Sequence, residues 1–214
     1  MTDNFPIRRG DLKPEMFIFG QIVGGKDFEI DEGISCEVIV QVGDQWELFT
    51  NRTNFQTQTS YPEPGELTVW NHPLDLNFSC KAAFGWPKMI FRIWRLDETN
   101  RMDILSYGQT HVPNTSGFHH LEVPTWSLKG KFADEALFHF IGPPKLIGSD
   151  PVKFDLSNVQ NLETKSSGTI VLELEILFKN FQNLFISGQL KTREEREFER
   201  RGIPDLRDER TDRQ

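Results

Sequence analysis

The chain has 214 residues and a formal net charge of −8 at pH 7. This length fits one domain with room for extra segments, and such a domain can bury a core without disulfides or a structural metal. The acidic balance argues against a general nucleic-acid-binding protein and against bulk attraction to anionic lipid, although it leaves room for a local basic patch.

The N-terminus and the two cysteines indicate a cytoplasmic protein. The first ten residues contain no apolar core of a signal peptide. No apolar run approaches the roughly 18 residues of a membrane-spanning helix. Cys36 and Cys80 both fall within predicted strands and do not form a spaced framework, so we interpret them as buried free thiols in a reducing compartment.

The first third of the chain alternates short strand patterns with polar loops. Residues 1–14 are polar, and we expect them to be flexible. A polar loop rich in Thr, Asn and Gln is expected over Asn51–Gly65. The predicted strands are Met16–Val23, Cys36–Val42, Trp46–Phe49 and Glu66–Trp70.

The stretch from Val69 to Asp97 holds the clearest pair of strands. Leu74, Leu76 and Phe78 alternate with polar residues, whereas Met89–Leu96 is apolar at nearly every position. A strand that is apolar on both sides is either central and covered, or it carries an exposed patch for a partner. Pro73 and Pro87 are each expected at the start of a strand, where the missing N–H costs no ladder hydrogen bond.

The second half continues the strand pattern and then changes period. Strands are predicted over Ile104–His111 and Phe118–Val123, the latter ended by Pro124-Thr125-Trp126, and a strong final strand covers Ile170–Leu177. Apolar residues recur at helical spacing around residues 131–141, which predicts one short amphipathic helix. From Lys191 the tail is almost wholly charged, with basic and acidic residues in balance, and we expect it to be disordered or a solvated helix.

These patterns together predict an all-β fold, an antiparallel β-sandwich of about eight strands with one short late helix. The expected organisation is a flexible N-terminus over 1–14, one domain over 15–185 and a charged tail over 186–214.

Four ordered motifs give the chain a family resemblance. They are W-N-H-P-L-D-L-N-F at Trp70–Phe78, F-R-I-W-R-L-D at Phe91–Asp97, Y-G-Q-T-H-V-P at Tyr107–Pro113, and G-T-I-V-L-E-L-E-I-L-F-K-N-F at Gly168–Phe181. This set resembles the B9 domain family of ciliary transition-zone proteins. The resemblance implies a C2-type sandwich that assembles with other B9-domain proteins at the base of the cilium, in the transition zone and at the basal body. It also implies a role in ciliogenesis and in the barrier that controls entry of membrane proteins.

Because many C2-type modules bind calcium through loop aspartates, the loop after Met89–Leu96 is a candidate calcium site. Its three ligand places hold Arg95, Asp97 and Asp103, and the arginine puts a cation where the ion would sit. Asp31 in an earlier loop would compensate only in part for the ligand that is missing at Arg95. We therefore predict no metal and no cofactor, with Asp97, Asp103 and Asp31 as weak candidates for a metal site.

No catalytic arrangement emerges from the sequence. It contains no G-x-S-x-G elbow, no P-loop and no G-x-G-x-x-G after a strand. His119 and His120 are neighbours in a predicted strand, so their side chains would point to opposite faces and could not easily share an ion. We predict that the protein is not an enzyme.

Two groups of residues are candidates for binding a partner. Arg92, Trp94 and Arg95 lie on the two-sided apolar strand, and interfaces favour Trp and Arg. Phe181, Leu184 and Phe185 follow helical spacing after the last strand, and they either cover the open end of the sandwich or dock a partner. The leading hypothesis is a non-enzymatic assembly subunit. The alternative is a C2-type membrane-binding module, calcium-dependent or calcium-independent; nucleic acid is not an expected partner.

Overall fold

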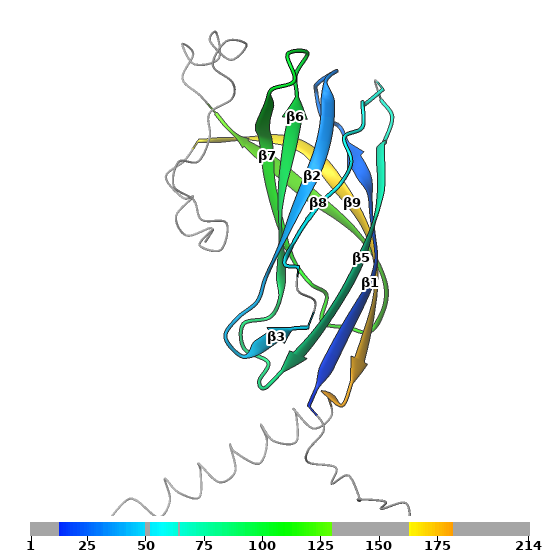
Figure 1. Ribbon diagram of the computed structural model, residues 1–214, viewed down its shortest axis with the longest axis vertical. Coiled ribbons are helices and arrows are strands. Elements are labelled where there is room, and N and C mark those ends of the chain that lie inside the picture. The colour runs from blue at the N-terminus through cyan, green and yellow to red at the C-terminus, as the bar shows by residue number, and fades with distance from the viewer. Residues whose placement is uncertain (1–12, 50–51, 64, 130–162, 182–214) are drawn as a thin grey trace, which may run out of the picture.

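The computed structural model describes residues 13–49, 52–63, 65–129 and 163–181, which fold into an all-β unit (Figure 1). Its strands pair antiparallel in the order β3-β5-β1-β9-β8-β7-β6-β2-β4. They are β1 (Glu15–Lys26), β2 (Gly33–Gln41), β3 (Trp46–Leu48), β4 (Asn54–Gln56), β5 (Thr68–Cys80), β6 (Lys88–Leu96), β7 (Met102–His111), β8 (Gly117–Leu128) and β9 (Thr164–Lys179).

The sheet curls so that its two halves face each other, as a sandwich does (Figure 1). One half is β3-β5-β1-β9-β8 and the other is β7-β6-β2-β4, and only the pairs Tyr107–Trp126 and Gly108–Thr125 join β7 to β8. Side chains from both halves, such as Ile18 and Val38, are fully buried in one shared core. The predicted all-β antiparallel fold is therefore confirmed.

Two prolines lie inside strands rather than at the ends where we expected them. Pro73 is within β5 and pairs with Gln21, so the predicted strand Glu66–Trp70 and the strand that follows it are one strand. Among the described residues β3 pairs with β5 only at Phe78–Cys80, so Pro73 faces an edge without a strand neighbour, where proline is tolerated. Pro124 does not end β8, because a register shift between Pro124 and Thr125 accommodates it.

The expected polar loop Asn51–Gly65 contains a short strand that we did not predict. Residues Asn54–Gln56 form β4 and pair with Glu37–Ile39 of β2. Three residues with Phe55 as their single apolar member carry no readable period, so pairing with β2 rather than local pattern creates this strand. The predicted helix at 131–141 and the tail over 186–214 lie outside the described residues.

Both cysteines are free and buried, as predicted. Burial raises the pKa of the Cys36 thiol far above its ordinary value and also raises that of Cys80. Both thiols therefore stay protonated and behave as apolar core side chains. Within the described residues no helix has the length and apolarity that crossing a bilayer requires.

Candidate functional site

Trp94 and Arg92 lie on the outer face of β6 and share one carboxylate. Trp94 Nε1 donates a hydrogen bond of 2.9 Å to Glu37 Oε2, and Arg92 Nη1 lies 3.5 Å from the same oxygen. Asn54 Nδ2 donates to the other oxygen of Glu37 at 2.7 Å. The side chains of Arg92 and Glu37 are only 17% and 13% exposed. The polar groups of this cluster therefore already have partners within the domain.

Arg95 does not join that cluster, because successive side chains of a strand point to opposite faces. Its side chain is 4% exposed, with Nη1 3.5 Å from Glu32 Oε2 and Nη2 3.9 Å from Asp103 Oδ2. Arg95 thus lies on the side of β6 that carries Phe91 and Ile93 into the core. The structure brings Arg92 and Trp94 together and buries Arg95 elsewhere.

The candidate calcium aspartates are engaged by the chain itself. Asp103 is 2% exposed, and Arg101 Nε lies 2.8 Å from its Oδ2. Asp97 Oδ1 accepts hydrogen bonds from the Thr99 hydroxyl and from the backbone N–H groups of Thr99 and Arg101, and these hold the pKa of Asp97 below its ordinary value. Two guanidinium groups border Asp103 where a calcium cage would require oxygen ligands, so these residues do not fit the ion. Asp31 is exposed, and no metal-ligating group of three is found within the described ranges.

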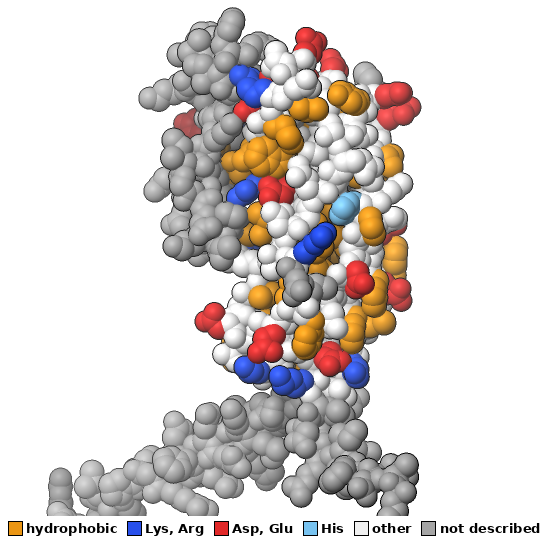
Figure 2. All heavy atoms as spheres, in the orientation of Figure 1, with side chains coloured by type: hydrophobic (Ala, Val, Ile, Leu, Met, Phe, Trp, Pro, Cys, Tyr) orange, Lys and Arg blue, Asp and Glu red, His pale blue; other side chains and the backbone are white. Residues whose placement is uncertain are grey.

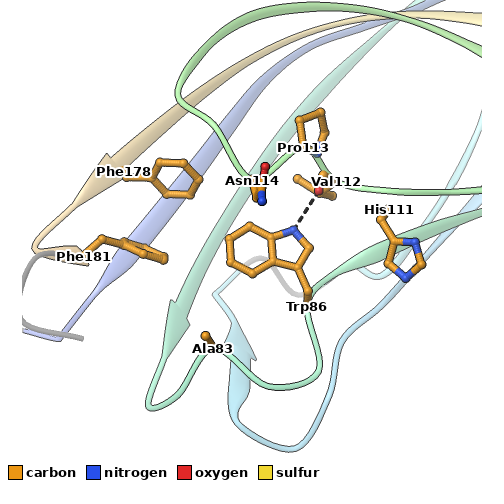
Figure 3. A pocket seen from close by; sticks show the side chains of 8 residues that line it. All are labelled: Ala83, Trp86, His111, Val112, Pro113, Asn114, Phe178 and Phe181. Atoms are coloured by element: carbon orange, nitrogen blue, oxygen red, sulfur yellow. Dashed lines mark hydrogen bonds between the residues drawn. The ribbon is translucent and has the colours of Figure 1, made fainter. Parts of the chain in front are cut away.

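An apolar pocket of about 680 Å³ opens at one end of the sandwich, and Phe181 forms part of its wall (Figure 3). Trp86 stands opposite Phe178 and Phe181, and its Nε1 donates a hydrogen bond of 2.7 Å to the Val112 carbonyl. The rings of Phe178 and Phe181 are 4.6 Å apart, and Trp46 packs edge-on against Trp86 at 4.9 Å. The structure thus places Phe181 against the end of the core, while Phe185 and Leu184 lie outside the described residues.

The packing of Phe181 leads to a stability prediction. Phe181→Ala should lower the free energy of unfolding by about 1 kcal/mol, because a half-buried ring loses its aromatic neighbours. Phe84 is 81% exposed, so Phe84→Ala should change that free energy by less than about 0.5 kcal/mol. Urea titration of both variants checks this; equal stability of the two would mean that Phe181 contributes nothing to the core.

Sequence reasoning missed a third surface, on the outside of the other half of the sandwich. Its members are large apolar side chains that one face of neighbouring strands exposes to solvent. Phe19 is 41%, Leu177 45% and Phe118 68% exposed, and Phe17 stacks on Phe19 with ring centroids 6.5 Å apart. We call Phe17, Phe19, Phe118 and Leu177 the outer aromatic face.

Strand register puts these four residues side by side. Phe17 of β1 pairs with Leu177 of β9, and Phe19 pairs with Glu175, which in turn pairs with Phe118 of β8. In the space-filling view, hydrophobic and acidic side chains mingle along the edge of the molecule over β1 and β5 (Figure 2). The signal was present in the sequence, since Met16–Phe19 is apolar at each position and a strand can bury only one of its faces here.

Comparison with known proteins agrees with the motifs. Residues 16–177 match the family model B9-C2, described as "Ciliary basal body-associated, B9 protein". The chain belongs to the B9 family. The match begins within β1 and ends within β9, so it includes part or all of every strand of this B9 domain.

Individual proteins of the family are similar to this B9 domain over most or part of its length. It is 33% identical over 168 residues to B9 domain-containing protein 2 of Homo sapiens, covering 78% of this chain and 95% of that one. The Drosophila melanogaster protein of the same name is 29% identical, with 78% and 94% covered. B9 domain-containing protein 1 of Xenopus laevis is 28% identical over 52% of this chain and 58% of its own. Among solved structures, a C2 domain of plant Extended Synaptotagmin 1 aligns with a TM-score of 0.38 and 11% identity, over 78% of this chain and 96% of that one.

Proposed function

We propose that this B9 domain is a non-enzymatic interaction subunit of a ciliary transition-zone complex. In that complex it would bind other B9-domain proteins, and ciliogenesis and ciliary gating would depend on it. The family's description as ciliary basal body-associated supports a place at the base of the cilium. Similarity to relatives of two kinds, B9 domain-containing proteins 2 and 1, supports partners within the same family.

The observation that carries this proposal is the exposure of large aromatic side chains on a folded unit. Phe118 and Phe19 are 68% and 41% exposed, although the core holds many other aromatic rings. Exposed apolar patches on soluble proteins mark sites of contact with other molecules. The buried acid Asp103 is instead neutralised by arginines, which is an arrangement that stabilises a fold rather than one that activates a substrate.

Co-expression with B9 domain-containing protein 1 of the same organism tests the proposal. We expect the two chains to elute together from size-exclusion chromatography at micromolar concentration, with a light-scattering mass equal to their sum. Elution as separate monomers would contradict the proposal.

A calcium-independent membrane contact is the second candidate, and one loop favours it. Phe84 lies in the connection between β5 and β6, three residues after Lys81, whose side chain is 63% exposed and whose Nζ is 3.4 Å from Glu47 Oε1. An apolar tip beside a cation can insert into an anionic surface. Sedimentation with phosphatidylserine vesicles in a chelator separates the candidates. If the protein is an interaction subunit, it stays in the supernatant. If the protein pellets with the vesicles and the Phe84→Ser variant does not, membrane binding is favoured.

A further inference from the structure

The outer aromatic face carries its own charge pattern. Phe19 of β1 lies in register between Asp75 of β5 and Glu175 of β9, and neighbouring strands are only about 4.8 Å apart. Within the described residues no ion pair involves Asp75 or Glu175, whereas Lys26 of β1 and Lys179 of β9 pair with other acids, Glu122 and Glu15. Two uncompensated carboxylates therefore border the exposed ring of Phe19.

These carboxylates determine which partner can cover the face. Burying an ionised carboxylate costs several kcal/mol unless the partner supplies an opposite charge. An anionic lipid surface would add negative charge beside both acids. A second copy of this chain, placed on a two-fold axis, would bring the same acids to the same interface. A protein surface with apolar side chains ringed by Lys or Arg satisfies both the rings and the carboxylates.

We propose that the outer aromatic face is the surface through which this B9 domain binds a basic-rimmed protein partner. The inference rests on the proposed function, because it takes that partner to be another B9-domain protein. Phe19, Phe118 and Leu177 supply the apolar centre, and Asp75 and Glu175 supply the charges that select the partner. The Trp94 cluster contributes less to binding, because Glu37 already satisfies its polar groups.

The test measures binding of immobilised B9 domain-containing protein 1 to full-length variants by surface plasmon resonance. The double variant Phe19→Ser/Phe118→Ser should weaken affinity by about tenfold or more. The Asp75→Lys/Glu175→Lys variant should associate more slowly than the wild type. Its association rate should also lose most of the salt dependence that the wild type shows. Phe84→Ser is the matched control, since it removes an even more exposed ring from another part of the surface. All variants should stay folded, with melting temperatures within about 4 °C of the wild type, because the replaced side chains are more than a third exposed.

Each result has a separate meaning. If the wild type binds and the face variants bind equally well, the face assignment is overturned while the proposed function stands. If the wild type forms no complex, the proposed function fails and the partner assigned to this face fails with it. If the wild type self-associates and the Phe19→Ser/Phe118→Ser variant does not, the occupant of the face is a second copy of this chain. If the wild type binds vesicles and the variant does not, the occupant is a lipid surface. Either result overturns the basic-rimmed partner.

Discussion

Replacing Arg95 by methionine is expected to lower the free energy of unfolding by about 3 kcal/mol. The guanidinium is almost wholly buried and lies between Glu32 and Asp103. Methionine fills much of the same volume but leaves the buried carboxylate of Asp103 with Arg101 as its remaining cation. A buried charge that loses a partner destabilises a fold far more than an exposed ion pair stabilises it. Equilibrium urea denaturation of the two proteins measures the difference.

A double variant separates this charge effect from a loss of packing. Arg95→Met/Asp103→Asn removes both charges, and it should recover at least half of the stability that Arg95→Met loses, because apolar or neutral replacements of buried ion pairs are often tolerated. Arg92→Met is the control on the same strand, where Glu37 keeps hydrogen bonds from Trp94 and Asn54, and its effect should be about 1 kcal/mol. A double variant as unstable as Arg95→Met would show that the arginine acts through its volume alone.

Arg95 also shows where sequence reasoning stopped. The sequence predicted that an arginine at this place would oppose a calcium ion, and the structure puts guanidinium groups against Asp103. However, Arg95 was grouped with Arg92 and Trp94 by proximity along the strand. The two-residue period of a strand separates Arg95 from both, and applying it would have placed Arg95 on the core side.

Elements with a clear two-residue period were predictable, and elements made by tertiary pairing were not. Residues Cys36–Val42 alternate cleanly, and the strand found there, Gly33–Gln41, differs mainly at its ends. The strand Asn54–Gln56 and the two-pair junction between β7 and β8 arise from pairing with a second strand, which the pattern within one strand does not specify. The outer aromatic face required register between β1, β8 and β9, which periodicity within any one strand does not specify.

Trp70→Ala is expected to be the most destabilising single change in the core, lowering the free energy of unfolding by about 3 to 5 kcal/mol. The side chain is 1% exposed, and its Nε1 donates a hydrogen bond of 3.2 Å to the Ile34 carbonyl across the sandwich. Its ring packs so closely on Gly25 that a Cβ at that glycine would lie 2.9 Å from Trp70 Cη2. Alanine would leave a cavity in this tight region and would remove the donor to a buried carbonyl.

Two matched variants show how much of the stability lost in Trp70→Ala comes from the hydrogen bond and how much from burial of the ring. Trp70→Phe keeps an aromatic ring but cannot donate to the Ile34 carbonyl, so it should lose about 1 to 2 kcal/mol. Trp94→Ala removes a partly exposed tryptophan whose acceptor, Glu37, retains the hydrogen bond from Asn54, and the expected loss is about 1 kcal/mol. Urea denaturation followed by circular dichroism gives all three values. Only a buried ring leaves a cavity that the surrounding strands cannot close. Equal losses of stability for Trp70→Ala and Trp94→Ala would therefore contradict the assignment of Trp70 to the core between the two halves of the sheet.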